Sequence, residues 1–122
     1  NNLKYMVKNL SRLLDLWGLL TVELFQRNKE LIFNEIAPRP HNSFHWTIEA
    51  CKSSQFEILI KSITGENINH QLVNKNWKMV NLLGNDIKNL KQYNFHKNQN
   101  VHIYGKQEVK NGRKMGHITY PI

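Results

Sequence analysis

The chain has 122 residues, 40% of them hydrophobic, which is enough for a compact domain with an apolar core. Its formal net charge of +8 is typical of nucleic-acid-binding proteins, but the lysines are scattered through every segment, which weighs against a nucleic-acid partner. The only cysteine, Cys51, excludes an intramolecular disulfide framework and a cysteine-based zinc site. No apolar run has the length of a membrane span or the pattern of a signal peptide, so we expect a cytoplasmic protein with no membrane partner.

The first predicted element is an amphipathic helix from Leu3 to Trp17. Leucines and aromatic residues recur there at intervals of three and four, and basic residues occupy another face. Gly18 is the expected stop, because glycine readily takes the left-handed conformation that ends helices. No methionine opens the chain and the helix starts almost at once, so we expect an excised or incomplete piece of a longer protein.

Two strand-like runs follow between residues 18 and 37, joined by a short polar turn. We expect the segment 27–29 to form a three-residue hairpin loop, with Asn28 or Lys29 in the left-handed conformation. This register places Glu23 and Glu35 on one face of the sheet as diagonal neighbours, about 7–8 Å apart between backbones.

Two carboxylates on one face could hold a hard divalent cation. Mg²⁺ is commonly bound by one or two carboxylates, with substrate phosphates completing its octahedron. This interpretation depends on the loop, because a two-residue loop would put Glu23 opposite Asn34 and turn Glu35 to the other face. A surface hairpin with two solvated acids is the simpler alternative.

The loop after the second strand carries further polar side chains. Pro38 and Pro40 each remove a backbone donor and favour extended geometry before them, so the strand cannot continue. The stiff loop presents Arg39, His41 and Asn42 beside the carboxylates. A cation, an imidazole and an amide next to paired acids indicate a phosphate-binding and acid–base site.

The rest of the chain predicts helices and then strands. A helix is expected from Thr47, with a break near Ser53-Ser54 and an end at Gly65, followed by a loop over residues 66–76. The later elements, in order, are a strand at Trp77–Leu83 closed by Gly84-Asn85, a helix at Ile87–Phe95, and strands at Val101–Lys106 and Met115–Tyr120 around a turn with Asn111-Gly112.

Seven sequence blocks resemble one known family. In chain order they are VELF, FNEIAPRPHNS, HWTIEAC, SQFE, MVNLLG, HIYGK and GRKMGHIT. The chain is similar in these blocks to PurK-type 5-(carboxyamino)imidazole ribonucleotide synthase, an ATP-grasp ligase of de novo purine synthesis. The same enzyme forms one half of fused phosphoribosylaminoimidazole carboxylases. The blocks extend from Gly18 to Tyr120, which is nearly the whole chain.

The resemblance implies an α+β fold. Residues 1–65 would be the C-terminal part of an ATP-grasp domain, built of a helix, a β-hairpin and a helix. Residues 66–76 would be a linker, and residues 77–122 a small β-rich C-terminal domain. The missing N-terminal part of the same enzyme would then be a partner of this chain, and a homodimer would be in keeping with the family.

The implied reaction joins bicarbonate to 5-aminoimidazole ribonucleotide with ATP, through carboxyphosphate, and gives N5-carboxyaminoimidazole ribonucleotide, ADP and phosphate. ATP and Mg²⁺ are the implied cofactors. The chain lacks the blocks for the ATP lid and the adenine pocket, so we expect it to be inactive alone.

The resemblance also assigns roles in the first half of the chain. Glu23 and Glu35 would bind the metal ion, and Asn34 together with Glu35 would hold the nucleotide end of the site. Arg39 would bind carboxyphosphate, and His41 would transfer a proton or orient the amine. The alternative for Arg39 and His41 is a purely structural role, in which they staple the loop to backbone carbonyls.

In the second half, Lys106 and Arg113 resemble the family's ligands of the ribonucleotide 5′-phosphate, and Lys114 would assist. Asn42 is grouped with these substrate-binding residues, although shaping the loop is its simpler role. An ordinary solvated basic turn is the alternative for the cations. One departure is clear, since the family has glycine where this chain has Phe44, and glycine in such loops provides a positive φ or close backbone approach.

Three other interpretations stay open. Formate-dependent glycinamide ribonucleotide transformylase is a sister ATP-grasp enzyme with similar VELF and PRPH segments, but NSFHWTIEAC and GRKMGH fit the carboxylating family better. A basic RNA-binding module would need clustered cations and exposed aromatic residues on one face. A non-catalytic interface or interaction module is the third.

Overall fold

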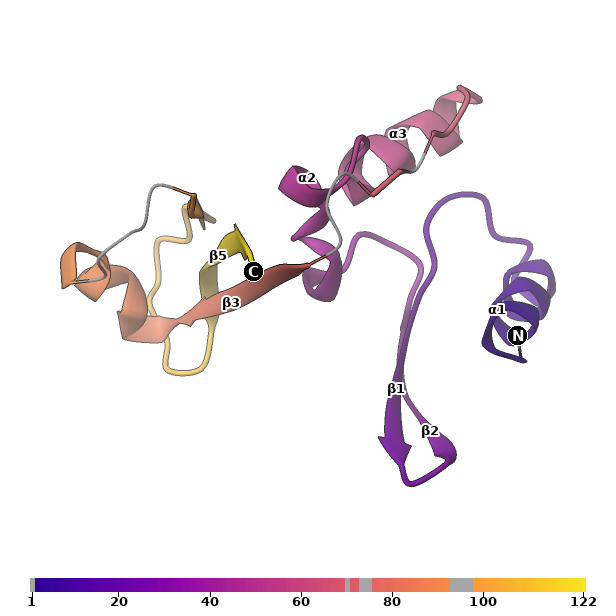
Figure 1. Ribbon diagram of the computed structural model, residues 1–122, viewed down its shortest axis with the longest axis horizontal. Helices are drawn as coiled ribbons and strands as arrows, with labels where there is room; N and C mark the ends of the chain where they lie inside the picture. The colour runs from indigo at the N-terminus through magenta and orange to yellow at the C-terminus, as the bar shows by residue number, and fades with distance from the viewer. Residues whose placement is uncertain (1, 70, 73–75, 93–97) are drawn as a thin grey trace. The chain divides into compact units, whose positions relative to one another are not determined.

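A computed structural model describes residues 2–69, 71–72, 76–92 and 98–122 of the chain. The fold is α+β, as expected, and it divides into two compact units, Asn1–Gln71 and Leu72–Ile122 (Figure 1). The first unit carries helices and a two-stranded sheet, and the second is built on a three-stranded antiparallel sheet. Among the described residues, no helix has both the length and the apolar character that crossing a membrane requires.

Helix α1 spans Asn2–Leu13 and ends before the expected boundary at Trp17. Asp15 takes a left-handed φ of 46°. Its N–H and the N–H of Leu16 donate back to helix carbonyl oxygens, at 3.1 and 3.0 Å. This is a Schellman closure, in which one left-handed residue satisfies the last carbonyl groups of a helix. Asp15, and not Gly18, therefore stops the helix.

Strands β1 (Thr21–Arg27) and β2 (Glu30–Ala37) form an antiparallel hairpin. Arg27 pairs with Glu30, so the connecting loop has two residues, and Asn28 has a φ of 57°. The expected three-residue loop is wrong, whereas the left-handed conformation at Asn28 is confirmed.

A β-bulge in β2 changes the pairing beyond the loop. Leu24 pairs with Phe33 but Glu23 pairs with Glu35, so the intervening Asn34 is the extra residue. Without the bulge, a two-residue loop would set Glu23 against Asn34 and turn Glu35 away. The bulge shifts the register by one residue, and the two glutamates lie directly opposite each other instead of diagonally.

The segment after the hairpin forms three short helices, namely η1 (Asn42–Phe44), α2 (Thr47–Ala50) and α3 (Gln55–Thr64). The break between α2 and α3 lies where it was predicted. A capping box begins α3, since the Ser54 hydroxyl accepts from the Glu57 N–H and the Glu57 carboxylate accepts from the Ser54 N–H. The helix ends at Gly65, as predicted, with a left-handed φ of 74°.

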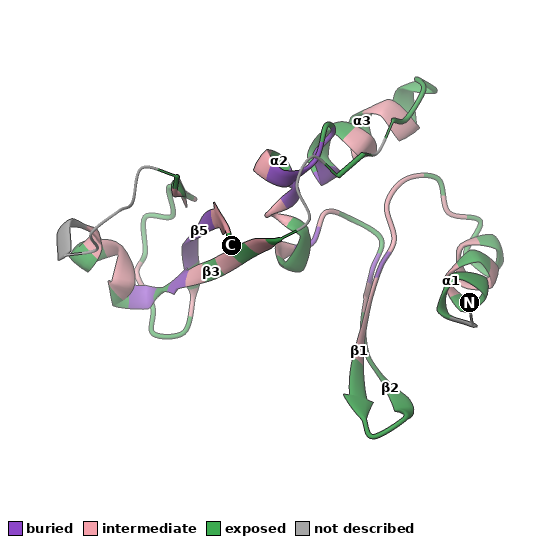
Figure 2. Ribbon diagram, in the orientation of Figure 1, coloured by how far each residue is buried: buried purple, intermediate pink, exposed green. Residues whose placement is uncertain are grey.

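In the second unit the sheet order is β3–β5–β4, with β3 at Trp77–Leu83, β4 at Asn100–Ile103 and β5 at Lys114–Pro121. Both neighbours pair antiparallel with β5. Figure 2 shows β5 largely in purple, the colour of buried residues. Met115, His117 and Thr119 of this strand are all at most 1% exposed. The core of this unit therefore lies along β5.

Two expectations in the second unit need correction. The 3₁₀ helix η2 covers Gly84–Gln92 in place of the helix expected at Ile87–Phe95, and residues 93–95 lie outside the described part of the chain. Strand β4 ends at Ile103, so Lys106 lies in the connection to β5 and not in a strand. The turn expected at residues 111–112 is present within that connection.

Candidate functional site

The bulge on the first hairpin brings an acidic pair together with a histidine. Glu23, Glu35 and His41 each offer one donor atom, and these atoms lie within 4.8 Å of one another. Glu23 is half-buried, Glu35 is exposed and His41 is buried. Two carboxylate oxygens and an imidazole nitrogen in this space form a set of ligands for a divalent cation.

His41 lies between the two carboxylates. Its Nδ1 is 3.3 Å from Glu23 Oε1, and its Nε2 is 3.6 Å from Glu35 Oε1. The imidazole is held by a contact to Ser43 Oγ, and the His41 backbone by two hydrogen bonds to the Gln55 side chain. Each nitrogen of the ring therefore faces a different glutamate.

Ser43 contacts both the Nδ1 atom of His41 and the Glu23 carboxylate. The Ser43 N–H donates to His41 Nδ1 at 3.3 Å when that nitrogen carries no hydrogen. The Ser43 hydroxyl donates to Glu23 Oε1 at 3.0 Å and lies 2.7 Å from His41 Nδ1. No local sequence pattern points to these contacts of Ser43.

Asn34 and Arg39 complete the cluster. The Asn34 amide donates to Glu23 Oε2 at 3.2 Å, which the bulge makes possible by turning Asn34 to the same face. Arg39 Nη2 is 3.8 Å from Glu35 Oε1, and its Nη1 donates to the Pro40 carbonyl at 3.0 Å. The Arg39 side chain is 62% exposed, so its guanidinium is accessible to an anion from solvent. Asn42 lies beside this cluster as the first residue of η1.

Gln55 is a second residue that sequence reasoning missed. It is 5% exposed, and its side-chain amide bonds to both the N–H and the C=O of His41, at 2.8 and 3.0 Å. The SQFE block contains this residue, but its spacing from His41 carries no periodic signal. Only the folded chain brings the two together.

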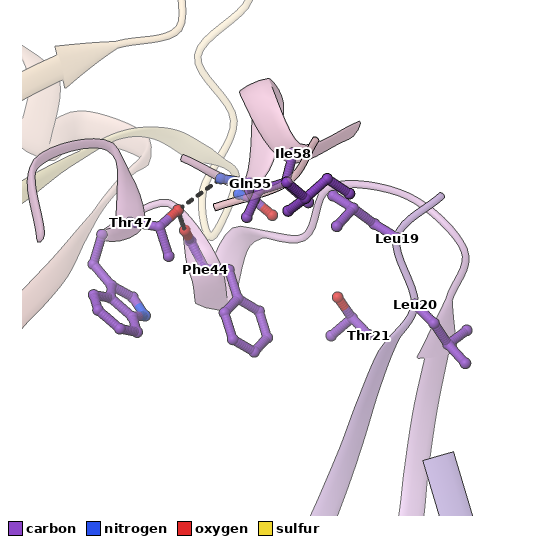
Figure 3. A pocket seen from close by; sticks show the side chains of 9 residues that line it. Leu19, Leu20, Thr21, Phe44, Thr47, Gln55 and Ile58 are labelled. Atoms are coloured by element: carbon purple, nitrogen blue, oxygen red, sulfur yellow. Dashed lines mark hydrogen bonds between the residues drawn. The ribbon is translucent and has the colours of Figure 1, made fainter. Parts of the chain in front are cut away.

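Phe44 replaces the family glycine without a left-handed backbone. It lies in η1, and the described non-glycine residues with positive φ are Asp15 and Asn28. Its ring lines an apolar cavity of about 450 Å³ together with Leu19 and Ile58 (Figure 3). The backbone at this position therefore does not require glycine.

The cations expected to bind a phosphate lie together on the β4–β5 connection of the second unit. Lys106 Nζ donates to the Lys114 carbonyl at 2.7 Å and lies 5.5 Å from the centre of the Tyr104 ring. Arg113 Nη1 donates to the Glu108 carbonyl at 3.0 Å. Lys106 is thus anchored to a carbonyl of β5 and Arg113 to one of the β4–β5 connection, and both belong to a different unit from the glutamate cluster.

Two family models match the chain. The ATP-grasp domain model matches residues 1–56, and the phosphoribosylaminoimidazole carboxylase C-terminal domain model matches residues 78–121. N5-carboxyaminoimidazole ribonucleotide synthase of Staphylococcus saprophyticus is 51% identical over 105 residues, which are 84% of this chain and 28% of that protein. The enzyme of the same name from Bacillus subtilis is 46% identical over 109 residues, which are 88% of this chain and 29% of that protein. The chain belongs to the N5-carboxyaminoimidazole ribonucleotide synthase family.

Solved structures of this family have the same fold as the chain. The N5-carboxyaminoimidazole synthetase of Staphylococcus aureus complexed with ADP has a TM-score of 0.87 at 42% identity, covering 99% of this chain and 34% of that one. The Aspergillus clavatus synthase in complex with ADP and 5-aminoimidazole ribonucleotide has a TM-score of 0.75 at 33% identity, covering 86% and 30%. The recognised family and the α+β fold are thereby confirmed.

The chain spans 28–32% of the length of the curated synthases that it matches. The glutamate cluster falls within the part that matches the ATP-grasp model, and Lys106, Arg113 and Lys114 fall within the part that matches the carboxylase C-terminal model. Each group of candidate site residues thus lies in a segment that the synthase family shares.

Proposed function

We propose that this chain supplies the cation-binding and phosphate-binding residues of an ATP- and bicarbonate-dependent ligase that carboxylates 5-aminoimidazole ribonucleotide. The observation that carries the proposal is the direct pairing of Glu23 with Glu35, with His41 between them. Membership in the synthase family supplies the reaction class. We place this reaction in cytoplasmic purine synthesis, and the homodimer stays a prediction.

The donor set fits Mg²⁺, which prefers oxygen ligands and is held by one or two carboxylates beside substrate phosphates. Glu23 and Glu35 would bind the ion, and the Asn34 amide keeps the Glu23 carboxylate oriented through its bond to Oε2. When bound, Mg²⁺ would neutralise negative charge on the ATP phosphates.

Arg39 and His41 would act on the reacting groups. The exposed guanidinium of Arg39 offers paired donors that match the oxygens of carboxyphosphate. The His41 ring presents Nδ1 to Ser43 and Glu23 and Nε2 to Glu35. His41 would give or take a proton as the amine of the ribonucleotide attacks.

The second unit would bind the 5′-phosphate of the ribonucleotide. Lys106 and Arg113 are the proposed ligands, with Lys114 beside them. The support is that Lys106 is held by a carbonyl oxygen of β5 and Arg113 by one of the preceding connection, which reduces the entropy lost when they bind an anion. The family match of this segment is the second support.

The test uses Mn²⁺ as a probe for the Mg²⁺ site, with binding to the full 122-residue chain measured by water-proton relaxation. We expect Glu23→Gln and Glu35→Gln each to weaken Mn²⁺ binding by at least about tenfold. Glu30→Gln is the matched control, because Glu30 lies on the same hairpin and pairs with Arg27 instead. Equal affinity in all four proteins would contradict the cation site.

The reaction is tested with a chimera in which this chain replaces the matching third of the Staphylococcus aureus synthase. We expect phosphate release that requires both bicarbonate and 5-aminoimidazole ribonucleotide. The chain alone is expected to bind Mn²⁺ but to release no phosphate above background. Release from the chimera that is independent of the ribonucleotide would contradict the assigned substrate.

A further inference from the structure

The backbone of His41 is enclosed by the side chain of one residue on another element. The His41 N–H donates to Gln55 Oε1 at 2.8 Å, and Gln55 Nε2 donates to the His41 carbonyl at 3.0 Å. Both bonds are buried, since His41 is 8% and Gln55 is 5% exposed. The amide of Gln55 therefore takes the place that a peptide group of a neighbouring strand would have.

This contact meets a specific need of the loop. The ladder of β2 ends at Ala37, before Pro38 and Pro40, so the backbone groups of His41 have no strand to pair with. A buried N–H or C=O without a partner is costly, and one side-chain amide satisfies both groups at once. The His41 carbonyl also accepts from the Phe44 N–H at 3.0 Å, so Gln55 and η1 together fix the position of the His41 backbone.

Gln55 is itself rigidly placed. Its N–H donates to Thr47 Oγ1 at 3.0 Å, and Thr47 Oγ1 donates to the Phe44 carbonyl at 2.6 Å (Figure 3). It is also the first residue of α3, within the capping box that Ser54 and Glu57 form. The start of α3, the helix α2 and the turn η1 are therefore tied together around this side chain.

We infer that Gln55 is a positioning residue that holds the His41 imidazole between Glu23 and Glu35. The inference rests on the proposed function for its catalytic meaning, and on the contacts above for its geometry. Gln55 touches the backbone of His41 and the ring of His45, where its Nε2 lies 2.7 Å from Nδ1. It would act on the reaction only by keeping the His41 backbone and ring in place.

The experiment replaces Gln55 by methionine in the full chain, which keeps the volume of the side chain and removes both bonds to His41. The first readout is the ¹⁵N spectrum of the His41 ring, which in the unmodified chain should show a single tautomer. In Gln55→Met we expect averaged tautomer signals, and Mn²⁺ affinity weaker by about tenfold. Glu57→Gln is the matched control, because it disturbs the same helix start without touching His41.

A purely structural role for Gln55 would lower thermal stability and leave the His41 spectrum of the folded protein unchanged. That result, with unchanged Mn²⁺ affinity, would overturn the inference. If Gln55→Met does not fold, the unmodified chain still decides, since the Gln55 side-chain amide should exchange slowly and show contacts to His41. A rapidly exchanging amide would overturn it equally.

The outcome separates the two proposals. If the unmodified chain binds no Mn²⁺, the cation site fails, yet the ring spectrum of Gln55→Met still tests the positioning role. If Mn²⁺ binding depends on Glu23 but neither readout responds to Gln55→Met, the positioning role fails and the cation site stands.

Discussion

Glu23 faces Glu35 across the first hairpin only because Asn34 is an extra residue in β2. The two-residue loop sets one register near the turn, and the bulge sets another where the acids lie. The same bulge turns the Asn34 amide toward Glu23 Oε2. The candidate cation site is therefore a product of an irregularity in the strand.

Asn34→Ala should weaken Mn²⁺ binding without unfolding the hairpin. The substitution removes the donor that orients Glu23, and loss of such supporting bonds lowers metal affinity by about tenfold or more. Water-proton relaxation measures the effect. Gln26→Ala is the control, since Gln26 lies on the same hairpin and donates only to a backbone carbonyl of the turn. Equal loss in both variants would show that the hairpin as a whole, and not Asn34, supports binding.

Gly116→Ala should destabilise the second unit. A Cβ at Gly116 would collide with the His102 backbone carbonyl on the neighbouring strand β4. Overpacking of this kind costs about 1–3 kcal/mol, which urea unfolding measures. In Gly112→Ala the added Cβ would meet open space, and the only cost is a side chain at a φ of 72°. We therefore expect this substitution to lower the free energy of unfolding by about 1 kcal/mol. A Gly116→Ala chain as stable as the unmodified one would contradict the register of β4.

The carboxyl of Glu57 should make stability depend on pH. Hydrogen bonds from the Ser54 N–H and hydroxyl lower its pKa below the ordinary 4.5. Its contribution is therefore present above that ordinary value and is lost as pH falls through the lowered pKa of the folded state. The unmodified chain should be more stable than Glu57→Gln at about pH 6, and the gap should narrow by about pH 3. A gap in urea midpoint that is constant with pH would contradict the capping box.

Phe44→Gly should leave Mn²⁺ affinity within about twofold of the unmodified chain, because the ring lines the apolar cavity and not the glutamate cluster. Stability should fall by about 1 kcal/mol, since glycine loses more backbone freedom on folding. Relaxation and urea unfolding measure the two effects. A marked gain in affinity would show that the ring obstructs the cation site.

Much of the fold could be predicted because local chemistry decided it. The strand at Trp77–Leu83, the break before α3 and the stop at Gly65 depend on alternation, a serine cap and a left-handed glycine. The end of α1 was mispredicted, since Asp15 takes a left-handed conformation that its residue type only weakly favours. The propensity to end a helix is higher for Gly18, but the backbone hydrogen bonds from Asp15 and Leu16 end the helix earlier.

The candidate site was predictable in its residues but not in its geometry. Glu23, Glu35 and His41 were identified from paired acids and a proline-rich loop. The bulge at Asn34 and the amide of Gln55 were missed, because each depends on a contact between segments. His41 and Gln55 are fourteen positions apart, and no periodic pattern in either segment connects them.

The order of strands in the second unit also bears on how that unit is made. β3 and β4 both pair with β5, and β5 comes after them in the chain. During synthesis on the ribosome, β3 and β4 would emerge before residues 114–121. The backbone groups that pair with β5 would stay without that partner until β5 is made. The sheet should form in one late step, so truncation within β5 would leave two strands that have lost their common partner.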